Sequence, residues 1–156
     1  MEPSIIEALN QYINDNLVMT SYCRTNLCLM DEIDDYLNEN YVDCKFSEVL
    51  LRIIDKHHLD DIEAYKRSAV DRKLFSKIKQ DRNYHPSKRL VAQFVIGMRL
   101  SEKEAKILMK SAGYTLTHSD LFDCIILFFI KNNIYDINYV DEALYRYGLK
   151  PLFSKE

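Results

Sequence analysis

Apolar side chains recur at intervals of three and four residues along most of the chain. In the stretch 46–58, for example, Val49, Leu50, Ile53 and Ile54 fall on one side of a helix. This spacing is typical of amphipathic helices that pack one face on a core. Only three glycines and three prolines occur in 156 residues, too few for the many tight turns of an all-β protein. The sequence therefore predicts an all-α helical bundle.

Residues at helix ends predict where the individual helices begin. Ser4 with Glu7, and Ser101 with Glu104, have the spacing of a capping box. Ser47 is expected to cap a further helix, because it directly precedes an apolar stripe. The expected helices cover about 4–17, 29–41, 47–58, 60–67, 71–80, 87–98, 101–113, 119–132 and a last segment from 136 onward, and only a tight turn at 68–70 separates the fourth from the fifth.

Charge is distributed unevenly along the chain. Residues 1–45 carry 9 acidic and 2 basic side chains, whereas residues 46–110 carry 15 basic and 9 acidic ones. The remaining residues, 111–156, are close to balance, and the net charge of the whole chain is -3. This asymmetry indicates either a basic binding face or an acidic segment that packs on such a face.

The cysteines and the longest apolar run indicate a cytoplasmic protein without a membrane span. No C-x-x-C pair occurs, and the chain does not start with a basic segment followed by an apolar one, so reduced thiols are expected. The longest apolar run, 124–130, is far shorter than the ~20 residues that cross a bilayer. It is expected to be a buried helix segment.

Motifs for catalysis or for metal binding are missing from the sequence. It contains no glycine loop that binds phosphate, no H-E-x-x-H and no G-x-S-x-G. His57 and His58 are adjacent, so on a helix their side chains point about 100° apart and cannot easily share one metal ion. We therefore expect no enzyme activity, no cofactor and no metal site.

Residues 46 to about 112 contain four stretches in the following order: "FSEVLLRIIDKHHL", "DDIEAYKRSAVDRKLFSKIKQ", "HPSK" and "LVAQFVIGMRLSEKEAKILMKSAGY". Together they resemble the lambda-repressor/Cro type of helix-turn-helix domain. The resemblance implies a phage-repressor-like bundle in which the second helix of the pair lies in the major groove of DNA. From Asp71 onward the chain also resembles uncharacterised bacterial and mobile-element proteins.

The resemblance further implies which side chains contact DNA. Those that face the groove are Arg72, Lys73, Ser76 and Lys77. Those that contact phosphates are Lys66, Arg67, Lys79, Arg82, Lys88 and Arg89. The residues themselves support this expectation, because nine basic and only two acidic side chains occur between positions 66 and 89. Such a segment can neutralise phosphates, and arginine can also pair with guanine.

Other residues favour a different function. Asp60, Asp61 and Glu63 stand where DNA-binding members of the family usually carry polar, uncharged side chains, and phosphates repel carboxylates. Tyr65 and Ala69 also differ from the small residue and the glycine that are common in the pair. A non-enzymatic protein-binding module, such as an adaptor or an inhibitor encoded by a mobile element, is the alternative to a DNA-binding transcriptional regulator.

The domain organisation follows from these segments. We expect an acidic N-terminal helical extension (1–45), the helix-turn-helix domain (46–112), and C-terminal helices (113–156) that pack on the same core. Phe128, Phe129 and Tyr147 exceed what a five-helix bundle needs, and Ile137 is expected to face inward with Tyr147. Either residues 1–45 or a second subunit should cover the surplus aromatic side chains. A homodimer therefore stays open as an expectation, beside duplex DNA or a protein as the partner.

Overall fold

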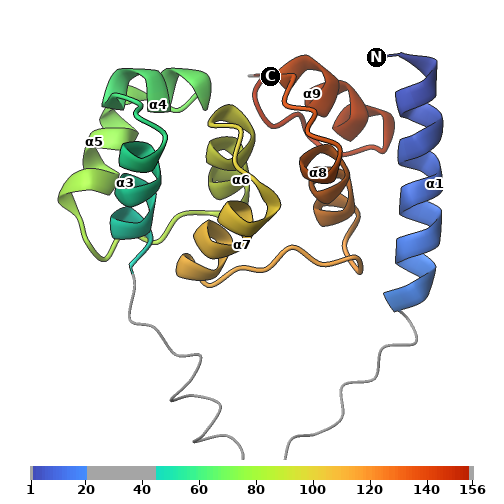
Figure 1. The fold of residues 1–156 in the computed structure, drawn as a ribbon, viewed down its shortest axis with the longest axis horizontal. Coiled ribbons are helices and arrows are strands. Elements are labelled where there is room, and N and C mark those ends of the chain that lie inside the picture. The colour runs from blue at the N-terminus through green and yellow to red at the C-terminus, as the bar shows by residue number, and fades with distance from the viewer. Residues whose placement is uncertain (1, 21–44, 155–156) are drawn as a thin grey trace, which may run out of the picture.

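The computed structural model describes residues 2–20 and 45–154, with side chains for 2–16 and 45–154. This part of the chain forms eight α-helices and no strand. The helices are α1 (Pro3–Thr20), α3 (Phe46–Lys56), α4 (Asp61–Arg67), α5 (Arg72–Gln80), α6 (Lys88–Gly97), α7 (Glu102–Ser111), α8 (Leu121–Lys131) and α9 (Ile137–Arg146) (Figure 1). The all-α prediction is confirmed, whereas the helix predicted over 29–41 lies outside the described residues.

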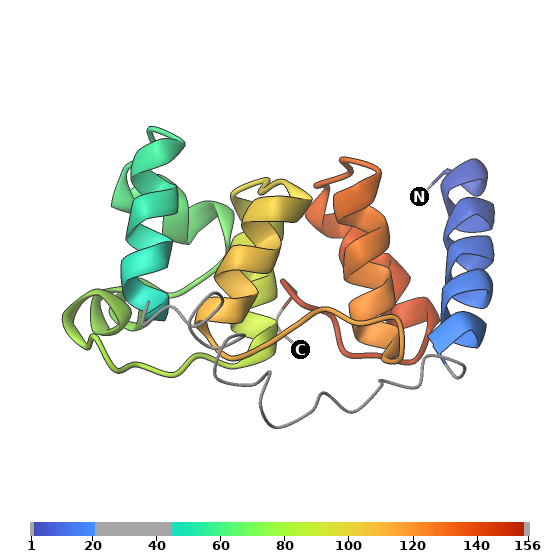
Figure 2. The ribbon, with the colours of Figure 1, turned by 60° about the horizontal axis from the view of Figure 1, so that its bottom comes forward.

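The helices form an elongated row, seen from two directions in Figures 1 and 2. Helices α3, α4 and α5 form one end, α6 and α7 the middle, and α8 with α9 the next layer. Helix α1 forms the other end and packs on α8. Neighbouring layers are joined by the packing of α3 on α7, α4 on α6, and α7 on α8.

Helix α8 provides the most completely buried segment of the described chain. Every residue from 122 to 130 is buried, because α1, α7 and α9 pack around this helix. The prediction of a buried helix over 124–130 is therefore confirmed. Cys124 lies in this segment as a buried free thiol, and the other three cysteines lie outside the described residues.

Three expectations about helix ends and faces are wrong. Ser47 does not cap α3: the N-cap is Lys45, and Ser47 is buried within the first turn. Ser4 likewise lies inside α1, which begins at Pro3. Ile137, expected to face inward, is 38% exposed. The capping box of Ser101 and Glu104 is present as predicted.

Helices α4 and α6 approach each other at Gly97. A Cβ atom built on Gly97 would lie 2.5 Å from the Cα of Ser68 and 2.6 Å from the carbonyl oxygen of Arg67. Only a residue without a side chain allows the two backbones to come this close. Gly97 therefore fixes the distance between the end of α4 and the end of α6.

We expect the substitution Gly97→Ala to destabilise the fold by about 1–3 kcal/mol, because the new methyl group would overlap the α4 backbone. Helix propensity alone would give the opposite sign, a gain of about 1 kcal/mol. Urea unfolding measures the change. Amide hydrogen exchange should show that α4 and α5 open more readily in this variant.

Gly113→Ala is the matched control, because no neighbouring atom lies within 4 Å of a Cβ built there and its φ of +81° is the only obstacle. That variant should lose stability without selective opening of α4 and α5. A Gly97→Ala protein as stable as the wild type would contradict the role given to this contact.

Glu104 joins α3 to α7. Its carboxylate accepts hydrogen bonds from Lys56 Nζ at 2.8 Å, from His57 Nε2 at 3.0 Å and from the backbone N–H of Ser101 at 3.1 Å. Burial alone would raise the pKa of Glu104, but the hydrogen bonds from Lys56, Ser101 and His57 lower it to about 2. The ionised carboxylate therefore stabilises the packing of the two helices.

A carboxylate whose pKa is lowered by folding contributes stability above its unfolded pKa, and this contribution is lost as the pH falls through the folded value. We expect the wild-type protein to lose the contribution of Glu104 between about pH 4.5 and pH 2. Glu104→Gln should remove that part of the pH dependence, as measured by urea unfolding across the range. Asp55→Asn, which alters an exposed carboxylate of α3, should retain that part of the pH dependence. Equal dependence of the unfolding free energy on pH in wild type and Glu104→Gln would contradict the account.

Candidate nucleic-acid interface

A tight turn joins α4 to α5. Asp60 and Glu63 form a reciprocal capping box that starts α4, and Asp71 caps α5 by accepting from the N–H of Lys73. Between the two helices Ala69 adopts φ +52°, the left-handed conformation that favours glycine. The N–H of Val70 closes the turn on the carbonyl oxygen of Tyr65 at 2.9 Å.

Helix α5 has one buried face. Phe75 and Ile78 are 2% and 1% exposed, and the Phe75 ring packs on Tyr65 of α4 and on Phe94 of α6. Because the apolar side chains all point into the core, the polar and basic ones are left on the outer face. The orientation of α5 is therefore set by its apolar residues.

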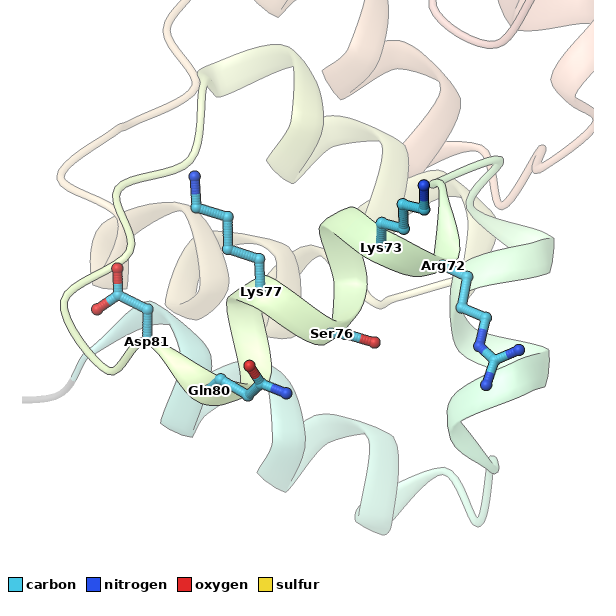
Figure 3. A pocket seen from close by; sticks show the side chains of 6 residues that line it. All are labelled: Arg72, Lys73, Ser76, Lys77, Gln80 and Asp81. Carbon is cyan, nitrogen blue, oxygen red and sulfur yellow. The ribbon is translucent and has the colours of Figure 1, made fainter.

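The outer face of α5 brings together all four residues predicted to face the DNA groove. Arg72, Lys73, Ser76 and Lys77 line an open hollow of about 550 Å³, seen from close by in Figure 3. Arg72 and Lys73 have no carboxylate partner among the described residues. Lys77 Nζ lies 5.7 Å from the centre of the Tyr84 ring, which can hold a cation by its π face.

Gln80 belongs to the same hollow and was not among the predicted contacts. Its position four residues after Ser76 places it on the same face of the helix. This spacing is visible in the sequence and could have identified Gln80. We call the set Arg72, Lys73, Ser76, Lys77 and Gln80 the α5 face.

Three other predicted phosphate contacts are paired with carboxylates at the protein surface. Lys79 lies 2.5 Å from Asp61, Arg82 lies 2.6 Å from Glu48, and Arg67 lies 3.4 Å from Glu63. Exposed ion pairs of this kind contribute about 0–1 kcal/mol, so they can exchange partners readily. Lys66 is exposed on α4. All four residues lie near the surface, but three of them are paired with carboxylates there.

Lys88 forms an ion pair with a residue in the C-terminal half of the chain. Its ammonium group lies 2.6 Å from Oδ2 of Asp123, a carboxylate that is completely buried on α8. The backbone N–H of Thr117 donates to the same oxygen, and Oδ1 has no hydrogen-bond partner among the described residues. Lys88 is thus the main compensation for a buried negative charge.

Arg89 is also held by distant segments of the chain. Its guanidinium donates to the carbonyl oxygens of Lys150 at 2.6 Å and Pro151 at 2.8 Å, and lies 5.1 Å from the centre of the Phe122 ring. The structure therefore places Lys88 and Arg89 at the junction with the C-terminal helices, apart from the α5 face. Both residues are engaged in contacts within the fold.

The side of α5 that faces α4 has a different character. A groove of about 430 Å³ runs between the two helices, and its lining includes Asp61, Ile62 and Tyr65. Ile62 is 52% exposed. Arg72 and Lys79 also line this groove, and Asp81 lines the hollow on the other side, so the groove differs from the hollow mainly by its exposed apolar residue.

Searches against protein-family models, curated protein sequences and solved structures find no match to this chain. Within the described ranges, no helix combines the length and the apolar character that crossing a membrane requires.

The structural role of Lys88 can be separated from that of the α5 face. We expect Lys88→Ala to destabilise the protein by about 2–4 kcal/mol, because it leaves the buried carboxylate of Asp123 without its cation. Arg72→Ala, at an exposed position, should change stability by no more than about 0.5 kcal/mol. Thermal or urea unfolding of the two variants gives the comparison; equal stabilities would contradict the importance of the Lys88–Asp123 pair.

Proposed function

We propose that the chain is a helix-turn-helix protein that binds duplex DNA through the α5 face and acts as a regulator of transcription. The observation that carries this proposal is the exposed cationic surface of Arg72, Lys73 and Lys77 on α5. This helix follows α4 after a tight turn in which Ala69 has a left-handed backbone conformation. The sequence resemblance of residues 46–112 to repressor domains points the same way. No catalytic activity is assigned to the protein.

The chemistry of the α5 face suits both parts of a DNA contact. Lysine and arginine side chains neutralise phosphates and release counterions, which supplies affinity without sequence preference. Arginine pairs with guanine and glutamine with adenine through two hydrogen bonds each, which supplies selectivity. Arg72 stands at the first turn of α5 and Gln80 at its end, so base contacts are expected from these two positions.

The groove between α4 and α5 favours a second candidate function. Its exposed Ile62 and the aromatic ring of Tyr65 are features of a protein-contact surface, and the carboxylate of Asp61 would repel phosphates. In this alternative the chain is an adaptor or inhibitor, and the helix pair binds a protein. The two candidates differ in what they predict for the basic side chains of α5.

Fluorescence anisotropy with random-sequence duplex DNA at about 50 and 200 mM salt tests the proposal, because affinity that comes from phosphate contacts falls steeply with salt. Lys73→Ala and Lys77→Ala should each weaken binding and reduce the slope of log K against log salt by about 0.9. Lys103→Ala, which alters another exposed lysine, on α7, is the control and should change neither quantity.

Asp61→Asn makes the opposite change at the same site. It removes a carboxylate beside the DNA path and releases Lys79 from its ion pair, so DNA binding should become tighter and more dependent on salt. Full-length protein that shows no affinity for duplex DNA, together with no gain in Asp61→Asn, would favour the protein-binding candidate.

A further inference from the structure

A second cationic hollow lies where α4, α6 and α9 meet. It has a volume of about 550 Å³, and its lining combines Arg67, Gly97, Arg99 and residues 135–138. Arg67 is the last residue of α4, Arg99 lies in the turn from α6 to α7, and the segment 135–138 leads into α9. Figure 1 shows α6 between α4 and α9. The hollow shares no residue with the α5 face, and the fold builds it from three separate parts of the sequence.

Two guanidinium groups give this hollow its charge. Arg99 is exposed and has no carboxylate partner within the ranges 2–16 and 45–154. Arg67 pairs with Glu63 at 3.4 Å, and because both side chains are about half exposed, this pair opens readily. Asp136 is the one carboxylate among the lining residues, and it accepts hydrogen bonds from two backbone N–H groups at the start of α9. Two cations are therefore available to an external anion.

The backbone at Arg99 has an unfavourable conformation. Its φ of +55° lies in the left-handed region, which glycine tolerates better than residues with a side chain. Glycine occupies the corresponding position after α7 and after α9, at Gly113 and Gly148. Replacement of Arg99 by glycine would therefore remove the cation and relieve the backbone at the same time. This combination allows a role in binding to be separated from a role in folding.

Two arginine side chains on one hollow suit a phosphate group. The guanidinium group is planar and stays charged, and its N–H groups can donate two parallel hydrogen bonds to phosphate oxygens. The hollow is open and both guanidinium groups are exposed, so a free phosphate would be held weakly against water. A phosphate that belongs to a larger molecule bound nearby would be present at a much higher effective concentration.

The position of the hollow favours duplex DNA as the source of that phosphate. Only residues 68–71 separate Arg67 from Arg72, the first residue of α5, so the hollow adjoins the N-terminal end of this helix. A helix in the major groove, which is about 12 Å wide, lies between two phosphate backbones. Cations just beyond the end of α5 are therefore placed to contact one of these backbones.

We propose that Arg67 and Arg99 hold a phosphate group of the same duplex that the α5 face binds. The interface then extends past α5 to the turn between α6 and α7 and to the start of α9. This inference rests on the proposed DNA-binding function. It adds Arg99, which lies outside the helix pair, to the residues that contact DNA.

Fluorescence anisotropy with random-sequence duplex DNA at about 50 and 200 mM salt tests this inference. Arg99→Gly should weaken binding and reduce the slope of log K against log salt by about 0.9, because one phosphate contact is lost. The same variant should have a higher Tm than the wild type, because glycine relieves the left-handed backbone. A protein that loses affinity while it gains stability cannot owe the loss to unfolding. Arg99→Lys, which keeps the cation and the strain, should retain the slope.

His58→Gly is the matched control, because His58 is exposed, has a φ of +54° and lies outside the hollow. This variant should also raise the Tm, but it should leave the slope unchanged. If Lys77→Ala lowers the slope and Arg99→Gly does not, this inference is overturned and the proposed function stands. A wild-type protein without affinity for duplex DNA would overturn both.

Thermal unfolding in inorganic phosphate distinguishes a duplex from a free ligand. A ligand that binds the folded protein raises its Tm, so about 10 mM phosphate in place of chloride, at constant ionic strength, reports binding of the free anion. The change in Tm should be the same for the wild type and for Arg99→Gly. A rise that occurs in the wild type and is lost in Arg99→Gly would identify free phosphate as the ligand and overturn the assignment to DNA.

Discussion

The contact between the backbones of α4 and α6 at Gly97 determines the position of α4 and, through the turn at Ala69, the orientation of α5. Because α4 can come this close to α6, its last residue, Arg67, and the buried Ser68 lie directly against the end of α6. The chain then reverses at Ala69 and enters α5, whose apolar residues reach Tyr65 and Phe94. The outward direction of the α5 face is a consequence of this packing.

Basic side chains in the central segment have three different environments, and only one of them suits an external polyanion. Arg72 and Lys73 extend into solvent without a carboxylate partner in the described part of the chain. Lys79 and Arg82 form surface pairs that cost little to open. Lys88 compensates a buried charge and is costly to displace. The number of basic residues in the central segment is therefore larger than the number of phosphate contacts that the proposed interface can make.

Much of the fold could be predicted from the sequence, because helix periodicity and capping are local properties. The capping box at Ser101 and the buried run on α8 are examples. Ser47 was misassigned because Phe46 belongs to the core and α3 begins two residues earlier than the cap rule indicates. The four side chains predicted to face DNA lie together because residues of one helix keep their spacing. The partners of Lys88 and Arg89 could not be predicted, since they lie 35 and 61 residues away and depend on tertiary packing.

The central claim is that the α5 face is the surface through which this protein binds nucleic acid. An NMR titration of ¹⁵N-labelled full-length protein with a short duplex tests it most directly, since amide shifts report contacts residue by residue. The account predicts that the perturbed amides cluster in 71–81 and at Tyr84, and that the perturbations weaken as salt is added. Shifts confined to α1, α7 or α9, or no shifts at all, would contradict it.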